Sequence, residues 1–383
     1  MNLELSEEQE AVRELAEDFV AREITPHVVA WDRAESVDKS IVKKLGALGF
    51  LGLTIPEEYG GSGGDHLAYC LVTEELGRGD SSVRGIVSVS LGLVAKTIAS
   101  WGDEEQKRRW LPRLTAGEAV GCFALTEPGT GSDAGNLSTR AVRDGDDYVI
   151  NGSKMFITNG TWADVVLLFA RTGDVPGRRG VSAFLVPADT PGLTRRTVHG
   201  KLGLRGQATA ELVLEDVRVP AATLLGPEGK GFSLAMSALA KGRMSVAAGC
   251  VGIAQAALDA AVRYAGEREQ FGQPIAGYQL VQELISDISV DVDAARMLTW
   301  RVADLVDRGQ DFATAASTAK LFASEAAVRA ANNALQVFGG YGYIDEYPVG
   351  KLVRDARVMT LYEGTSQIQK LIIGRALTGV SAF

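Results

Sequence analysis

The amino-acid sequence predicts an α+β fold: an N-terminal helical domain, a central antiparallel β-barrel or sandwich domain, and a C-terminal helical bundle. Three observations carry this prediction. Apolar residues recur at three- and four-residue spacing in the first third of the chain. Short β-type runs between turn dipeptides fill the middle, and long alanine-rich periodic segments follow. We expect domain boundaries at 1–118, 119–224 and 225–383.

The helical regions are set by periodicity and by end signals. Ser6 followed by Glu7 and Glu8 is typical of a helix start, because a serine oxygen and early acidic residues satisfy the free backbone N–H groups. The glycine-rich stretch 59–64 predicts a loop. We expect helices near residues 5–19, 37–49, 67–77, 81–100, 103–114, 231–266, 278–308, 312–338 and 365–378.

The middle of the chain reads as a sheet. Asn151-Gly152 predicts a hairpin turn, because both residues tolerate positive φ. Pro128-Gly129 and Pro176-Gly177 mark further turns. The expected strands are 122–126, 148–151, 154–158, 165–170, 181–186 and 211–219.

Composition excludes several classes of function. The net charge of -9 without a Lys/Arg cluster argues against nucleic acid as a partner. The three cysteines are far apart and the three histidines are scattered, which argues against a disulfide framework, a metal site or a histidine-activated nucleophile. We expect a cytoplasmic protein with no secretory signal. The apolar segment 85–95 reads as a buried helix, and we expect no membrane span.

Two glycine-rich segments are candidate ligand loops. In Phe123–Asp133 (FALTEPGTGSD), small residues let backbone N–H groups approach a bulky ligand, and Thr126 and Ser132 add hydroxyls. A plain surface turn is the alternative. Gly339-Gly340 follows a helical segment, so it is either a phosphate site or an ordinary helix C-terminus.

Glu363 is the candidate base. Leu361 and Tyr362 give it apolar neighbours, and a helix begins near Thr365. Burial would raise the pKa of this carboxyl and the helix N-terminus would lower it, as a base working near neutral pH requires. An ordinary acidic first-turn residue is the alternative. Three arginines on apolar helical stretches could hold a phosphate or an internal carboxylate, or form ordinary pairs: Arg243, Arg268 and Arg354.

These signals, in this order, resemble the acyl-CoA dehydrogenase family from about residue 5 to 378. Four motifs carry the resemblance, with support from KLGLRGQATAELVLEDVRVP (201–220). They are FALTEPGTGSD (123–133), NGSKMFITNG (151–160), REQFGQPIAGYQ (268–279) and QVFGGYGYIDEYPVGKLVRDARVMTLYEGTSQIQ (336–369).

The resemblance implies a C-terminal four-helix bundle, a homotetramer built as a dimer of dimers, and FAD between the β-domain and the C-terminal helices. It implies oxidation of an acyl-CoA substrate to the trans-2-enoyl-CoA in fatty acid β-oxidation. In the family, the base residue's backbone N–H and a flavin hydroxyl bind the thioester carbonyl, and flavin takes the β-hydride. An electron-transfer flavoprotein is the expected acceptor.

The family's site residues match positions of this sequence. The cofactor-binding positions are Phe123, Leu125, Thr126, Gly131, Ser132, Phe156, Ile157, Thr158, Arg268, Gln270, Phe271, Gln279, Gln336, Val337, Gly339, Gly340, Thr365 and Gln367, and the substrate-binding positions are Ser132, Arg243, Tyr362 and Gly364. Arg268, Gln270, Phe271 and Gln279 match contacts made across the dimer.

Glu363 matches the catalytic glutamate of the short- and medium-chain branch. The isovaleryl and long-chain branches take their base from an earlier helix, where this sequence has Gly242. Phe156 stands where the family usually has tryptophan, a position that bears on electron exit toward the flavoprotein partner. Rival activities of the same fold are acyl-CoA oxidase, nitroalkane oxidase, flavin monooxygenase and dehydrogenation of a carrier-protein-bound acyl group. A helical assembly protein without enzyme activity is a further alternative.

Overall fold

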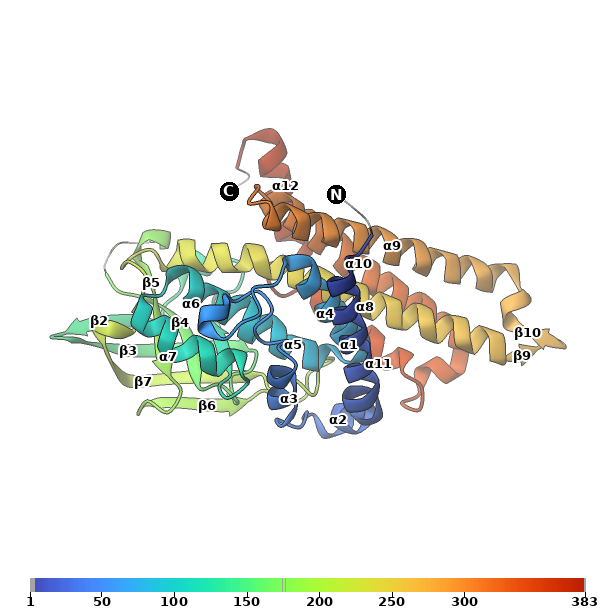
Figure 1. The fold of residues 1–383 in the computed structure, drawn as a ribbon, viewed down its shortest axis with the longest axis horizontal. Coiled ribbons are helices and arrows are strands. Elements are labelled where there is room, and N and C mark those ends of the chain that lie inside the picture. The colour runs from blue at the N-terminus through green and yellow to red at the C-terminus, as the bar shows by residue number, and fades with distance from the viewer. Residues whose placement is uncertain (1–3, 174, 176, 382–383) are drawn as a thin grey trace.

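The computed structural model describes residues 4–173, 175 and 177–381, which form a helical part, a sheet and a second helical part in that order (Figure 1). Ser6 caps the first helix as expected, because its side chain accepts a hydrogen bond from the Gln9 N–H. The N-terminal helices are α1 (Glu7–Phe19), α2 (Val28–Ala34), α3 (Ile41–Ala47), α4 (His66–Gly79), α5 (Ser81–Val89), α6 (Lys96–Trp101) and α7 (Glu104–Thr115). The expected single helix over 81–100 is interrupted by a π-helical turn, Ser90–Ala95.

The sheet has eight strands in the order β6-β7-β3-β2-β4-β5-β8, with β1 also beside β4. It is mixed rather than wholly antiparallel, because β1 runs parallel to β4. The strands are β1 (Gly121–Ala124), β2 (Arg140–Asp144), β3 (Asp147–Ile157), β4 (Val165–Arg171), β5 (Val181–Pro187), β6 (Leu193–Thr197), β7 (Ala210–Pro220) and β8 (Leu224–Leu225). Three strands were not expected from the sequence: β2 and β6, which are short and largely exposed, and the two-residue β8.

Strand β4 divides two hydrophobic cores. Val165, Leu167 and Phe169 pack into the main core shared with the helices, whereas Val166 and Leu168 pack into a separate core of the β-domain. Successive side chains of a strand point to opposite faces, so a strand buried on both sides is apolar without interruption.

The predicted hairpin at Asn151-Gly152 is wrong, because these residues lie inside the continuous strand β3. A register shift against β7 occurs between Ile150 and Gly152. Asn151 Nδ2 donates to Asp216 Oδ1 at 3.0 Å. Gly152 has φ +150°, and a Cβ there would lie 2.6 Å from Thr139 Oγ1, so glycine is required. The turn-forming residues therefore make a β-bulge, and the hairpin between β2 and β3 turns at Gly145 instead.

The C-terminal helices are α8 (Gly231–Glu267), α9 (Gln279–Asp307), α10 (Ala313–Phe338), α11 (Val349–Met359) and α12 (Ser366–Thr378), of which only α11 was not expected. A small hairpin, β9 (Glu269–Gln270) and β10 (Gln273–Pro274), joins α8 to α9 at the end of the molecule opposite the sheet (Figure 1). Glycines allow close helix contact: a Cβ on Gly77 of α4 would lie 2.7 Å from the Gly249 carbonyl oxygen of α8.

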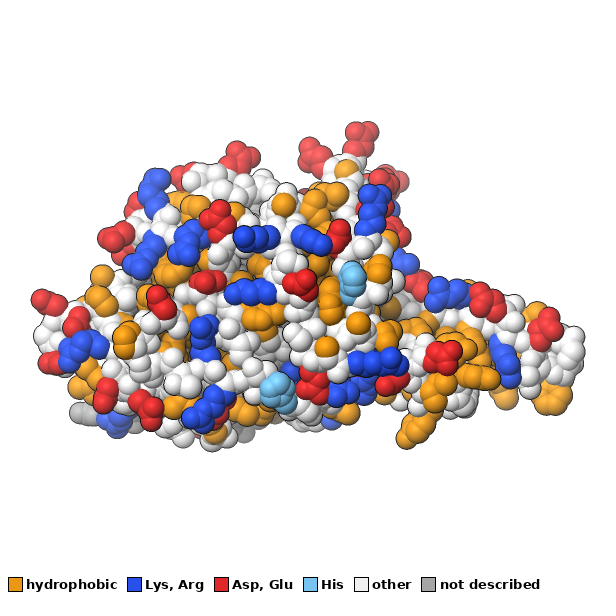
Figure 2. Space-filling view, turned by 90° about the horizontal axis from the view of Figure 1, so that it is seen from below, with side chains coloured by type: hydrophobic (Ala, Val, Ile, Leu, Met, Phe, Trp, Pro, Cys, Tyr) orange, Lys and Arg blue, Asp and Glu red, His pale blue; other side chains and the backbone are white. Residues whose placement is uncertain are grey.

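Two helical segments are long and apolar enough to cross a membrane, Ser81–Trp101 and Gly231–Glu267. Their most apolar windows are 94% and 72% buried inside the protein, which is typical of core helices. Acidic and basic side chains are interspersed over the face in Figure 2, with hydrophobic side chains showing along the projecting helices.

Candidate active site

A tight loop between α11 and α12 carries Glu363. Glu363 has φ +51° and Gly364 has φ +92°, both in the left-handed region. A non-glycine residue in a sparsely populated backbone region costs on the order of 1–3 kcal/mol and persists only where the surroundings hold it. The Ser366 N–H donates to the Thr360 carbonyl at 3.0 Å, which closes the loop. Thr365 caps α12, because its side chain accepts from the Ile368 N–H.

The Glu363 carboxylate points into the protein against α8. Its Oε2 atom is buried and has no hydrogen-bond partner among the described residues. A Cβ on Gly242 would lie 2.3 Å from this oxygen and 2.9 Å from Leu93 Cδ2. While the Glu363 carboxylate occupies this place, no residue larger than glycine fits at position 242.

Opposing effects act on this carboxyl, and their net result is a raised pKa. Burial raises the pKa of Glu363, and the Arg84 guanidinium opposes this most strongly, followed by Lys320 and Arg243. The groups that lower the Glu363 pKa are therefore cations on other segments of the chain. From the sequence, only the N-terminus of α12 was expected to lower it. Arg243 is 8% exposed, and its Nε atom has no partner among the described residues.

Arg84 was not expected from the sequence and is 2% exposed. Its Nη2 donates to the Tyr362 hydroxyl at 2.5 Å and its Nη1 to Ser88 Oγ at 3.0 Å. Within the described chain its Nε has no acceptor and no carboxylate forms an ion pair with it. A side chain on Gly249 would collide with the guanidinium, with the added Cβ 2.8 Å from Nε. The signal in the sequence that could have identified Arg84 is that it is the one charged residue between Ser81 and Ala95.

Two more residues that the sequence analysis missed contact the same loop. Lys320 Nζ donates to the Gly364 carbonyl oxygen at 2.9 Å. Gln369 Nε2 donates to the Glu363 and Gly364 carbonyl oxygens at 3.2 and 3.0 Å. The base candidate is therefore held from α10 and from α12.

The loop after β1 is fixed at one end and open at the other. Lys154 Nζ donates to the Leu125 carbonyl at 3.1 Å, and Lys154 also forms a buried ion pair with Glu127 at 2.8 Å. The Met155 N–H donates to the Thr126 carbonyl at 2.9 Å. Farther along, Gly131 and Ser132 are exposed, and no atom lies within 4 Å of a Cβ built on Gly131.

Phe156 presents an aromatic side chain beside this loop at the end of β3. It is 64% exposed and has φ +60°, an uncommon conformation for a bulky residue. The next residue, Ile157, is buried, and Thr158 Oγ1 donates to Gln207 Oε1 at 3.3 Å. Phe123 is partly buried and packs on Phe169 with ring centroids 4.8 Å apart. An exposed ring on a strained backbone suits contact with a flat ligand.

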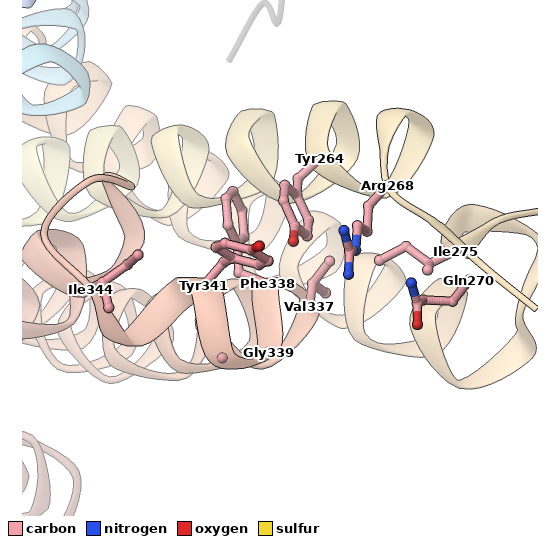
Figure 3. Close-up of a pocket in the computed structure, with 10 residues that line it drawn as sticks. Tyr264, Arg268, Gln270, Ile275, Val337, Phe338, Gly339, Tyr341 and Ile344 are labelled. Atoms are coloured by element: carbon pink, nitrogen blue, oxygen red, sulfur yellow. The ribbon is translucent and has the colours of Figure 1, made fainter.

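A second group of predicted residues lines a concave pocket of about 550 Å³ near the far end of α8 (Figure 3). Arg268, Gln270, Val337, Gly339 and Gly340 contribute to its wall. The Arg268 guanidinium lies 5.5 Å from the centre of the Tyr341 ring. Because neither glycine has an atom within 4 Å of a built Cβ, the backbone here is open to a ligand.

Other predicted residues lie outside this pocket. Phe271 is 96% exposed on the β9–β10 hairpin, and Gln279, Gln336 and Gln367 are exposed. Arg354 pairs with an internal carboxylate, because its Nη2 lies 2.6 Å from Asp32 Oδ2.

The chain matches three domains of one family along nearly its whole length. They are the acyl-CoA dehydrogenase N-terminal domain over residues 6–118, the middle domain over 122–217 and the C-terminal domain over 229–378.

Named relatives agree. Probable acyl-CoA dehydrogenase YngJ of Bacillus subtilis is 49% identical, with 98% of this chain and 100% of the relative aligned. The human mitochondrial short-chain specific acyl-CoA dehydrogenase is 44% identical, covering 97% of this chain and 90% of the relative.

Solved structures also superpose closely. Butyryl-CoA dehydrogenase from Megasphaera elsdenii matches with TM-score 0.96 and 41% identity, covering 98% of this chain and all of the other. A chain from a structure of the electron transferring flavoprotein of Acidaminococcus fermentans gives TM-score 0.97 and 42% identity, over 99% of this chain and 100% of the other. Glutaryl-CoA dehydrogenase from Mycobacterium smegmatis in complex with FADH2 matches with TM-score 0.95 and 37% identity, covering 99% of this chain and 96% of the other.

In chain order a sheet domain stands between two helical domains, and a desolvated carboxylate lies on a strained loop; this is the architecture of the acyl-CoA-oxidising enzymes that the chain superposes on. The chain belongs to the acyl-CoA dehydrogenase family. The predicted fold, the FAD cofactor and the FAD-dependent acyl-CoA dehydrogenase activity are confirmed.

The residues present fit FAD. The exposed Phe156 ring and the open glycine loop after β1 offer a surface for a flat aromatic group. The pocket with Arg268 and Gly339-Gly340 offers a guanidinium and accessible backbone, which suit a pyrophosphate.

Proposed function

We propose that Glu363 removes the α-proton of an acyl-CoA thioester in this protein. FAD, when bound, accepts the β-hydrogen as hydride. The observation that carries the assignment is a buried carboxylate oxygen with no partner among the described residues, lying where a side chain at Gly242 would otherwise stand. A desolvated carboxylate is a stronger base than a hydrated one, and its raised pKa suits proton transfer near neutral pH.

The loop offers a second element of the mechanism. The Glu363 backbone N–H has no acceptor among the described residues, so it is free to donate to the thioester oxygen. Hydrogen bonds to this oxygen stabilise the negative charge that develops when the α-proton leaves. Arg243, Tyr362 and Gly364 are proposed to border the thioester, and Ser132 the CoA moiety.

The two groups of cofactor residues support a shared FAD site. Phe156 belongs to the β-domain, whereas Arg268 lies beside the β9–β10 hairpin at the other end of the molecule (Figure 1). One FAD would need residues from two chains, which supports a dimer, and we propose that two such dimers form a tetramer. We also propose a cytoplasmic location and an electron-transfer flavoprotein as acceptor. The latter is supported by the likeness to a chain from a structure of such a flavoprotein.

Anaerobic mixing of the purified yellow protein with a panel of acyl-CoA thioesters tests this function. We expect flavin bleaching on the millisecond-to-second scale with short acyl groups such as butyryl-CoA. Electron transfer to an electron-transfer flavoprotein should be faster than oxygen consumption. Rapid oxygen consumption would support an oxidase instead, turnover only of a carrier-protein thioester would support the biosynthetic alternative, and no bleaching by any thioester would reject the assignment.

Arg84 favours a second candidate substrate class, acyl groups that end in a carboxylate. A buried guanidinium is costly to desolvate. In the described chain no carboxylate lies in direct contact with Arg84, and the Ser88 and Tyr362 hydroxyls and the nearby Glu363 charge act against this cost. It touches Tyr362, the residue before the base, so a short acyl chain extending from Glu363 could reach it. The similarity to glutaryl-CoA dehydrogenases gives this candidate independent support.

An Arg84→Met variant separates the two substrate classes. If glutaryl-CoA is a substrate, we expect its kcat/KM to fall about 100-fold in the variant, because truncating one partner of a buried charge pair costs about 2–5 kcal/mol. The kcat/KM for butyryl-CoA should fall much less, since this substrate has no terminal carboxylate to contact the guanidinium. An equal loss for both thioesters would mean that Arg84 serves only Glu363 and Tyr362. Failure of the wild-type protein to oxidise glutaryl-CoA would dismiss this substrate class.

A further inference from the structure

Lys320 is a buried cation that the proposed reaction has not yet used. Its side chain comes from the first third of α10, and the residue is 0% exposed. No carboxylate of the described residues forms an ion pair with it, and its Nζ donates a hydrogen bond to the Gly364 carbonyl at 2.9 Å. An ammonium group without a carboxylate partner needs other favourable electrostatics to remain buried.

The groups that face Lys320 come from three segments. Cys250 and Arg243 lie on α8, Glu325 lies one turn along α10, and Glu363 lies on the loop. Glu325 is already engaged, because its Oε1 accepts a hydrogen bond from Ser366 Oγ at 2.5 Å. The Glu363 carboxylate is therefore the nearby negative charge without a hydrogen-bonding partner on its Oε2 atom.

Lys320 and Gln369 bind the same backbone stretch. Gln369 Nε2 reaches both loop carbonyls, and Lys320 shares the second of them. Two successive residues with positive φ need this kind of support, because the conformation is unfavourable when free.

We propose that Lys320 is a positioning residue for the base: its ammonium group holds the Gly364 carbonyl, which fixes the direction of the Glu363 side chain, and places a positive charge near that carboxylate. The inference rests on the proposed role of Glu363. Lys320 acts through the loop and does not itself take part in the proton transfer between the thioester and Glu363.

Lys320→Met removes the donor and the charge while filling similar space. We expect the rate of flavin reduction by butyryl-CoA to fall about 10- to 100-fold with little change in KM, because a misplaced base slows the chemical step rather than binding. Lys320 favours the ionised form of Glu363, so its loss should raise the apparent pKa of the acidic limb of the pH–rate profile. Base activity would then be lost at a higher pH than in the wild-type protein.

Two further variants separate the charge from the hydrogen bond. Gln369→Leu removes donors to the same loop without removing a charge, so the rate should fall while the acidic limb stays in place. Lys320→Arg keeps the charge and should retain the wild-type limb even if its rate is lower. The inference is overturned if Lys320→Met leaves both rate and limb unchanged, or if Lys320→Arg shifts the limb as much as Lys320→Met.

Hydrogen exchange of the backbone amides in 360–366 gives a readout that does not depend on turnover. We expect faster exchange in Lys320→Met than in the wild-type protein, with unchanged exchange in the β-domain. Unchanged exchange at residues 360–366 would contradict the proposal that Lys320 holds this loop. If wild-type protein shows no flavin bleaching with any acyl-CoA, the base role of Glu363 fails separately, while the exchange result still decides whether Lys320 holds the loop.

Discussion

Glu363→Gln should retain FAD and the fold but lose bleaching of the flavin by acyl-CoA, with the reduction rate falling by about 10³-fold. Glutamine has nearly the same shape as glutamate, so the loop can keep its bonds to Lys320 and Gln369. It cannot accept the α-proton, which is why the chemical step should stop. Stopped-flow absorbance at the flavin bands under anaerobic conditions measures this rate.

The flavin content and the thermal midpoint of the Glu363→Gln protein serve as controls. Both should stay near the wild-type values, since the Glu363 side chain is not among the predicted FAD contacts. Normal bleaching in this variant would mean that another group takes the proton.

Gly242→Ala should lower flavin reduction about 100-fold, because a displacement near 1 Å in a catalytic group can cost that much. The added Cβ would lie 2.3 Å from Glu363 Oε2, so the carboxylate must move away from its place. The atoms in the way are the far ends of the Glu363 and Leu93 side chains, so the fold can adjust. Rapid mixing with butyryl-CoA gives the rate, and circular dichroism reports the fold.

The same helix supplies a matched control. Gly266 also lies in α8, but no atom is within 4 Å of a Cβ built on it. Gly266→Ala should therefore keep full activity and gain up to about 1 kcal/mol of helix stability. Equal activity in the two alanine variants would show that the space at Gly242 does not set the position of the base.

The fold was largely predictable because its elements repeat a local signal over many residues. The helices α8, α9 and α10 have apolar residues at regular spacing along their whole length, and β4 is a continuous apolar run. The Asn151-Gly152 hairpin failed because the signal was a dipeptide. Its backbone was decided by distant partners, Thr139 and Asp216, which no local pattern reveals.

In the candidate site, too, residues marked by a local motif were predicted and residues brought together only by the fold were not. Glu363 was found because its motif lies within one short segment. Arg84 and Lys320 were missed because they meet the loop only in three dimensions; Arg84 contacts Tyr362 across 278 positions of sequence. The resemblance to the family identified Gly242 as a position without a carboxylate. The structure adds the physical reason, since the Glu363 carboxylate fills the space beside it.

The position of the base relative to its substrate is tested most directly by a crystal structure of the FAD-loaded protein with an unreactive acyl-CoA analogue, one that carries sulfur in place of the β-carbon. We expect a Glu363 carboxylate oxygen at about 3–3.5 Å from the analogue's α-carbon, the near-attack range for proton transfer, with the flavin ring on the opposite face of the acyl chain. A Glu363 side chain turned away from the α-carbon, or protein atoms filling the space between them, would contradict the proposed chemistry.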